Sequence, residues 1–183
     1  MTRYVALLRG INVGSTRKLP MAELRELCAA EGFADVSTYI QSGNILLSSD
    51  RPAPDIEARL KVRIEQHFGL DVPVIVRTAD DWARYAAGSA FPDAEAERPK
   101  RLHLCLSVAP PADGIVEALT ARASEKERIA IDGDALWVDF GESIGNSKLT
   151  PAAFDKAAGS PMTARNWNTV LALAAMLDHK VAA

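Results

Sequence analysis

The 183-residue sequence has few of the residues that build metal centres and disulfides: two cysteines and three histidines. Cys28 falls in a helical pattern and Cys105 in a strand pattern, which is typical of small buried side chains rather than of a disulfide. His67, His103 and His179 are scattered, without the spacing of a metal site. We therefore expect neither a metal nor a cofactor.

Long apolar runs and a strong net charge are also missing. No apolar stretch approaches the ~20 residues of a membrane span, and Met1 leads into a strand pattern without a signal peptide. We expect a cytoplasmic protein without membrane contact. The net charge of −3 gives no overall basic field for nucleic acid. The chain is 48% apolar and 25% charged, like ordinary soluble domains, and its length suits one large or two small domains.

The first half of the chain has the pattern of a split β-α-β unit. Pro20 suits a helix start, Gly32 and Gly69 suit helix ends, and Gln41-Ser42-Gly43-Asn44 suits a hairpin turn. The predicted elements are, in order, a strand at 4–8, a helix from 20, strands at 36–40 and 45–48, a helix at 56–68 and a strand at 72–77.

The second half nearly repeats this order. Thr78 and Thr150 are expected to cap helices, and Leu149 and Phe154 have the spacing of a hydrophobic staple. The predicted elements are a helix from 78, a solvated linker at 88–100, a strand at 101–107, a helix around 115–119, a hairpin of 127–131 and 135–140, a helix from 151, and a last helix at about 164–178 capped at Thr163. The expected fold is α+β, with ferredoxin-like halves at 1–77 and 78–183, the second ending in an extra helix.

Polar residues follow the first and second predicted strands. These strands are parallel in a split β-α-β unit, so their outgoing turns share one edge of the sheet. Arg9 and Asn12 should therefore lie beside the polar residues of the hairpin, which are Gln41, Ser42 and Asn44. The end of the helix at 56–68, with His67, should reach the same edge.

This edge has a structural interpretation beside the functional one. Gly10 and Gly14 can simply supply positive φ angles, and Asn12 can cap its own turn. The glycine spacing fits neither the phosphate loop nor the dinucleotide fingerprint. Asp139-Phe140-Gly141 matches the kinase metal tripeptide in letters only.

The start of the last helix offers a second polar group. Free N–H groups at a helix start favour an anion, so Arg165, Asn166 and Asn168, with Lys148, could complete a ligand site. The alternative is that Asn166 only caps the helix and Trp167 anchors it in the core.

Several stretches together resemble the bacterial domain of unknown function 1697 family. They span nearly the whole chain: Leu7 to Gly14 (LLRGINVG), Pro20-Met21, Thr38 to Asn44 (TYIQSGN), Ser147-Lys148-Leu149 and Thr163 to Val170 (TARNWNTV). Ser15 departs from the family pattern, where a further glycine is common, so the loop should be slightly stiffer here. The resemblance implies two ferredoxin-like halves and supplies no substrate.

Four functions remain open from the residues. The first is binding of a small polar or anionic ligand at the edge formed by 9–18 and 41–44. The second is nucleic-acid binding through Arg3, Arg9, Arg17 and Lys18. The third is an interaction module whose edge meets a protein partner. The fourth is an enzyme, for which catalytic residues are unknown, because Ser147-Lys148 is a poor nucleophile pair and His67 is the single candidate base. The sequence does not give the oligomeric state.

Overall fold

The computed structural model describes residues 1–178, which divide into two compact units. The first is Met1–Ala83 together with the chain from Leu173, and the second is Arg84–Ala172. Each unit contains one four-stranded antiparallel sheet. The division expected after residue 77 lies at the end of the last strand of the first sheet, and contacts extend that unit to Ala83.

The first unit has the β-α-β-β-α-β order predicted for it. Its elements are β1 (Thr2–Leu8), α1 (Met21–Ala30), β2 (Ala34–Tyr39), β3 (Asn44–Ser49), α2 (Ala53–Phe68) and β4 (Val74–Thr78), followed by α3 (Ala79–Ala86). The strand order is β2-β3-β1-β4. Since β3 is antiparallel to both β1 and β2, these two strands run in the same direction, as expected.

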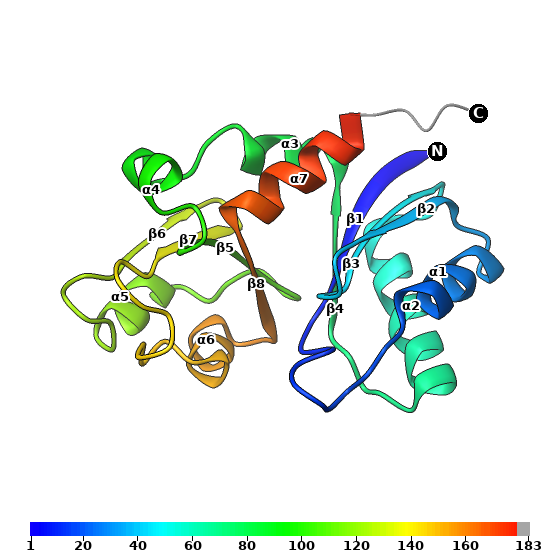
Figure 1. Cartoon of the computed structure of the whole chain (residues 1–183), viewed down its shortest axis with the longest axis horizontal. Coiled ribbons are helices and arrows are strands. Elements are labelled where there is room, and N and C mark those ends of the chain that lie inside the picture. Colours follow the sequence, from blue (N-terminus) through cyan, green and yellow to red (C-terminus); the bar gives the residue numbers. More distant parts are fainter. Residues whose placement is uncertain (179–183) are drawn as a thin grey trace. The chain divides into compact units, whose positions relative to one another are not determined.

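Helices α1 and α2 cover one face of the first sheet (Figure 1). Leu24 of α1 and Leu60 of α2 are fully buried with the alternate residues Tyr4, Ala6 and Leu8 of β1. Side chains two apart on a strand share a face, so β1 contributes one row to this core. Gly69 ends α2 in the left-handed conformation that glycine favours, at φ 66°.

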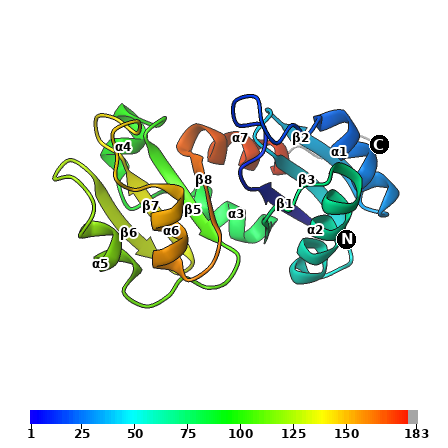
Figure 2. The same ribbon diagram turned by 90° about the horizontal axis from the view of Figure 1, so that it is seen from below.

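The second unit repeats the same topology. Its elements are α4 (Pro92–Glu97), β5 (Leu102–Ser107), α5 (Ile115–Thr120), β6 (Arg128–Asp132), β7 (Ala135–Asp139), α6 (Pro151–Ala158), β8 (Met162–Asn166) and the first part of α7 (Trp167–Asp178), whose residues from Leu173 group with the first unit. The strand order is β6-β7-β5-β8. Helices α5 and α6 cover one face of this sheet (Figure 2). Both halves are therefore ferredoxin-like in element order, and α7 is the extra helix.

The sequence prediction was wrong at the start of α7. Residues 162–166 form β8, which pairs with β5 from His103↔Asn166 to Ser107↔Met162. The helix begins at Trp167 and not at Ala164, and its cap is Asn166 rather than Thr163: the Thr169 N–H donates to Asn166 Oδ1 at 3.0 Å. The edge of β5 supplies hydrogen-bonding partners for the backbone N–H and C=O groups of residues 162–166, which therefore form a strand. Because β5 is distant in sequence, the local pattern does not indicate this pairing.

The stretch 88–100 was also predicted wrongly as a solvated linker. It contains α4, whose Ala94 is fully buried. Arg98, just after α4, reaches the sheet and binds Asp139 at the end of β7. This connection is thus part of the packed second unit.

Other local predictions are confirmed. Thr78 and Asp81 form a reciprocal capping box, with Asp81 N–H donating to Thr78 Oγ1 at 3.1 Å and Asp81 Oδ2 accepting from Thr78 N–H at 3.3 Å. Thr150 accepts from Ala153 N–H at the start of α6, and Leu149 and Phe154 are buried in one cluster. Of the helices within residues 1–178, none has the length and apolar character to cross a membrane.

Candidate ligand-binding site

The turns that leave β1 and β2 lie side by side, as the topology predicts. The Leu8 N–H donates to the Gly43 carbonyl at 2.8 Å. Gly43 has φ 76°, and a Cβ there would lie 2.7 Å from Leu8 Cβ and 2.8 Å from Ile11 Cδ1. Only a glycine fits this contact, so Gly43 brings the hairpin against the loop that follows β1.

Asn12 closes that loop on itself and onto the hairpin. Its amide nitrogen donates to the carbonyls of Leu19 at 3.0 Å and Gln41 at 2.8 Å, and its amide oxygen accepts from the Leu19 N–H at 2.8 Å. Asn12 has φ 53°, a conformation that asparagine tolerates better than most residues. The structural interpretation therefore accounts for the Asn12 side chain.

Asn44 and Ser42 are also engaged within the protein. Asn44 is fully buried, and its amide nitrogen donates to the Tyr39 carbonyl at 3.1 Å and to Ser42 Oγ at 2.9 Å. These bonds shape the hairpin. Gln41 is exposed at its tip and accepts the Asn12 bond through its carbonyl.

The loop itself presents backbone N–H groups to solvent. Within residues 1–178, no acceptor is found for the N–H groups of Gly10, Val13, Gly14 and Ser15. All four residues are exposed, and a Cβ at Gly10 or Gly14 would meet nothing within 4 Å. Successive N–H groups in turns with left-handed residues form concave anion sites in proteins, and Gly14 at φ 60° lies within this run.

Cationic residues flank these N–H groups in the sequence. Arg9 is half-buried at the end of β1, and its N–H donates to the Pro73 carbonyl at 3.1 Å. Arg17 and Lys18 are exposed on the loop, and Arg17 Nη2 donates to the Asp71 carbonyl at 2.7 Å. Arg3 is different, because it donates to the Met176 and Leu177 carbonyls at the end of α7.

Backbone strain gathers at the same edge. Ile40, just before the hairpin, has φ 49° and is 52% exposed. A left-handed β-branched residue is an outlier, and such a conformation costs on the order of 1–3 kcal/mol. Val13 on the facing loop is 63% exposed. Strain of this kind collects at functional sites.

His67 lies in the last turn of α2, where the sequence pattern predicts it. It is exposed, its Nε2 lies 3.7 Å from Glu23 Oε2, and its ring packs edge-on against Phe68. Glu23 is in the first turn of α1. His67 is the single candidate base that the sequence pattern predicts at this edge, and Glu23 is not part of that prediction.

The polar residues predicted at the start of α7 do not all point to one place. Arg165 and Asn166 are neighbours on β8 and therefore project to opposite faces of the sheet. Arg165 is buried and donates to Thr163 Oγ1 and to the Ala164 carbonyl, both at 2.8 Å. Burial lowers the pKa of its guanidinium to about 10. Asn166 caps α7, and Asn168 is exposed on its first turn.

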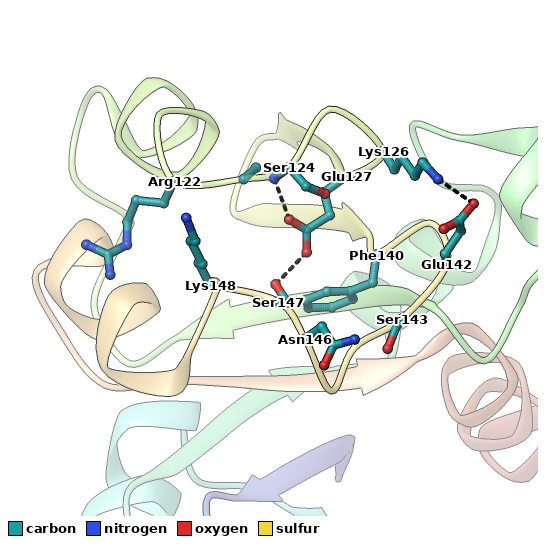
Figure 3. Close-up of a pocket in the computed structure, with 11 residues that line it drawn as sticks. Arg122, Ser124, Lys126, Glu127, Phe140, Glu142, Ser143, Asn146, Ser147 and Lys148 are labelled. Atoms are coloured by element: carbon teal, nitrogen blue, oxygen red, sulfur yellow. Dashed lines mark hydrogen bonds and ion pairs between the residues drawn. The ribbon is translucent and has the colours of Figure 1, made fainter.

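Trp167 anchors α7 as the structural alternative predicts. It is buried, and its ring lies edge-on to Trp137 with centroids 5.7 Å apart. Lys148 instead lines a pocket of the second unit (Figure 3), and residues 165–168 are not among the residues that line it. Arg9 and the 41–44 hairpin belong to the first unit, so a site that combines them with Lys148 or residues 165–168 stays a prediction.

Sequence reasoning missed a charged cluster at the end of β7. Asp139 is fully buried and accepts from Arg98 Nη2 at 2.7 Å and from Arg128 Nη2 at 2.8 Å. Both guanidinium groups also bind Asp93, and Arg128 lies over the Phe91 ring at 4.5 Å. The available signal was Asp139 itself, which shares the buried face of Trp137 on an apolar strand.

The pKa values in this cluster follow from its geometry. Burial raises the pKa of Asp139, but hydrogen bonds from Arg98, Arg128 and the Gly141 N–H outweigh it, so the pKa lies below 3.8. Hydrogen bonds from Arg128 and Arg98 lower the pKa of Asp93 to about 2. Both carboxylates stay ionised near neutral pH, and the cluster fastens α4 to the sheet.

No group of three metal-ligating side chains occurs in the part of the chain that the structure describes. The two cysteines there are buried free thiols. Burial raises the pKa of Cys105 to about 12, and burial together with the charge of Glu31 does the same for Cys28. Neither thiol is suited to act as a nucleophile.

Comparison with known proteins gives a family and a fold. The family model described as "Protein of unknown function (DUF1697)" matches residues 1–137. Among solved structures, the conserved bacterial protein SP0830 from Streptococcus pneumoniae is similar with a TM-score of 0.72 and 23% identity, covering 97% of this chain and 99% of that one. No curated protein gives a significant match.

Proposed function

Since the chain belongs to the DUF1697 family, whose description names no activity, we propose a function from the site itself: the protein binds a small anionic ligand at the edge formed by residues 9–18 and 41–44. The observation that carries this proposal is the set of exposed N–H groups at Gly10, Val13, Gly14 and Ser15, which have no acceptor within residues 1–178. An oxyanion is the chemical partner of such a set.

The surrounding residues support an anion rather than a cation. Arg17 and Lys18 are exposed on the loop, and Arg9 follows β1 at its base. The loop is held in place before any ligand arrives, through the three hydrogen bonds of the Asn12 side chain. A pre-organised loop loses little conformational entropy on binding, which favours affinity for a small ligand.

Calorimetric titration with inorganic phosphate tests the proposal. We expect saturable binding that weakens about tenfold in Arg17→Ala, because a charge-assisted hydrogen bond is lost. Arg51→Ala is the matched control. Arg51 is an exposed arginine beyond the end of β3, at the opposite end of the sheet, and its loss should leave binding unchanged. Absence of saturable heat, or equal weakening by both substitutions, would contradict the proposal.

A second candidate is an interaction surface for a protein partner. It is favoured by the exposed side chains of Val13 and Ile40, which are 63% and 52% accessible. Sedimentation velocity of the wild type and of Val13→Ser tests self-association. A concentration-dependent dimer that the substitution abolishes would support this candidate, and a monomer at all concentrations would remove its self-association form.

The nucleic-acid alternative has weaker support. Of the four cations predicted for it, Arg3 already binds the carbonyls at the end of α7. Binding to single-stranded oligonucleotides that falls steeply with salt would favour it. Lack of retention on heparin at low salt would argue against it.

A further inference from the structure

A second anion site is indicated by the pocket of about 260 Å³ in the second unit. Two connections form it: the one from α5 to β6 and the one from β7 to α6 (Figure 3). The volume lies below the ~300–1,000 Å³ of pockets for drug-sized ligands, so it suits a small molecule. All lining residues belong to the second unit, whereas the edge proposed above belongs to the first unit.

The charges around this pocket do not cancel. Lys126 is paired with Glu142 at 2.7 Å. The Glu127 carboxylate accepts hydrogen bonds from the Ser124 N–H at 2.7 Å and from the Ser147 hydroxyl. Two further cations, Arg122 and Lys148, line the same pocket, and neither side chain has a hydrogen bond or ion pair within residues 1–178. The three cationic side chains and two carboxylates of the lining therefore give it a net charge of +1.

The arrangement of these groups separates a cationic side from an apolar floor. In Figure 3, Arg122 and Lys148 lie together on one side of Glu127, while Lys126 and Glu142 lie on the other. Phe140 lies between these two sides, and its ring is held edge-on by His103 at 5.2 Å. A ligand with an anionic group and a small apolar body matches this order.

The pocket wall is fixed by the backbone. Gly141 has φ 61°, and a Cβ there would lie 2.4 Å from the Lys126 carbonyl oxygen, so glycine alone permits this approach. Arg101 Nη1 donates to the Gly141 carbonyl at 2.9 Å, and the Gly141 N–H donates to Asp139 Oδ1 at 3.0 Å. The buried charged cluster at Asp139 thus holds one wall of the pocket.

Ser147 contributes to the shape of the site and not to nucleophilic chemistry. Its hydroxyl donates to Glu127 and accepts from the Leu149 N–H at 3.0 Å. It does not face the Lys148 amine, consistent with the expectation for adjacent residues. Lys148 is therefore available for a ligand.

We propose that this pocket binds a small phosphate ester or carboxylate, with Arg122 and Lys148 holding the anionic group and Phe140 contacting the apolar part. Arginine forms two parallel hydrogen bonds to such groups, and lysine adds a point charge. All residues of this site belong to the second unit, whereas the edge at residues 9–18 belongs to the first.

Titration of the full chain with phenyl phosphate tests the site, with affinity measured by calorimetry and location by amide NMR shifts. We expect saturable shifts at Ser124 and Lys148, and affinity about tenfold weaker in both Arg122→Ala and Lys148→Ala. Both side chains are exposed, so neither substitution should prevent folding. Lys156→Ala is the matched control, an exposed lysine on α6 that does not line the pocket, and it should bind like the wild type.

Three results would overturn the proposal. The first is the absence of saturable shifts at Ser124 and Lys148. The second is equal weakening by the Lys148 and Lys156 substitutions, which would indicate nonspecific charge attraction. The third is saturable binding with shifts confined to residues 10–18 and lost in Arg17→Ala. In that case the pocket proposal fails and the proposed function stands.

Discussion

Replacing Gly43 by alanine tests whether the loop after β1 and the β2–β3 hairpin pack as one edge. The new Cβ would lie 2.7 Å from Leu8 Cβ and 2.8 Å from Ile11 Cδ1, both buried side chains. Overpacking a core costs about 1–3 kcal/mol, and the left-handed φ of 76° adds about 1–2 kcal/mol for a residue with a Cβ. We expect Gly43→Ala to lower the free energy of unfolding by about 2–5 kcal/mol.

Gly14→Ala is the matched control for this experiment. Gly14 has φ 60°, and a Cβ there would meet nothing within 4 Å, so only the conformational cost applies. That cost is about 1–2 kcal/mol. The assay is urea unfolding followed by the amide exchange of β1 and β3, which reports the first unit by itself. Equal losses in the two variants would refute the close contact at Gly43.

The remaining predictions concern the loop, the buried charges and the thiols. Asn12→Ala removes three hydrogen bonds and should cost about 1–3 kcal/mol by urea unfolding, whereas Gln41→Ala, exposed at the hairpin tip, should cost little. The folded-state pKa of Asp139 lies below its ordinary 3.8, so its contribution to stability is complete above that pH and is lost as the pH falls through the folded pKa. Asp139→Asn should therefore flatten the acid limb of a stability curve for the second unit, and an unchanged acid limb would contradict the assignment. Cys28 and Cys105 are buried with pKa values raised to about 12, so a thiol reagent should label neither until urea unfolds the chain. Rapid labelling of the native protein would show that these sites open.

Much of the fold could be predicted because local signals and topology agree. The Thr78–Asp81 box and the glycine at 69 mark helix ends through backbone hydrogen bonds that involve only nearby residues. The shared edge of β1 and β2 followed from the direction of strands in a split β-α-β unit. Contacts at Gly43 and Asn12 confirm that this edge brings the two turns together.

The missed features depend on partners that are distant in sequence. Residues 162–166 form a strand because their backbone groups pair with those of β5. The segment 88–100 is polar, but Arg98 is held by Asp139, 41 residues further along the chain. No sequence pattern within either segment indicates such a distant partner. The pocket at Arg122 and Lys148 likewise joins two loops that are distant in sequence, and Lys148 was predicted as a site residue without the other residues of this pocket.

The N–H groups of the loop after β1 that have no acceptor within residues 1–178 give the most direct test of the proposed anion site. An amide NMR titration with inorganic phosphate, at constant ionic strength, observes Gly10, Val13, Gly14 and Ser15 individually. We predict saturable shifts at these amides that Arg17→Ala reduces and Arg51→Ala does not. Amide positions that stay unchanged through millimolar phosphate would contradict it.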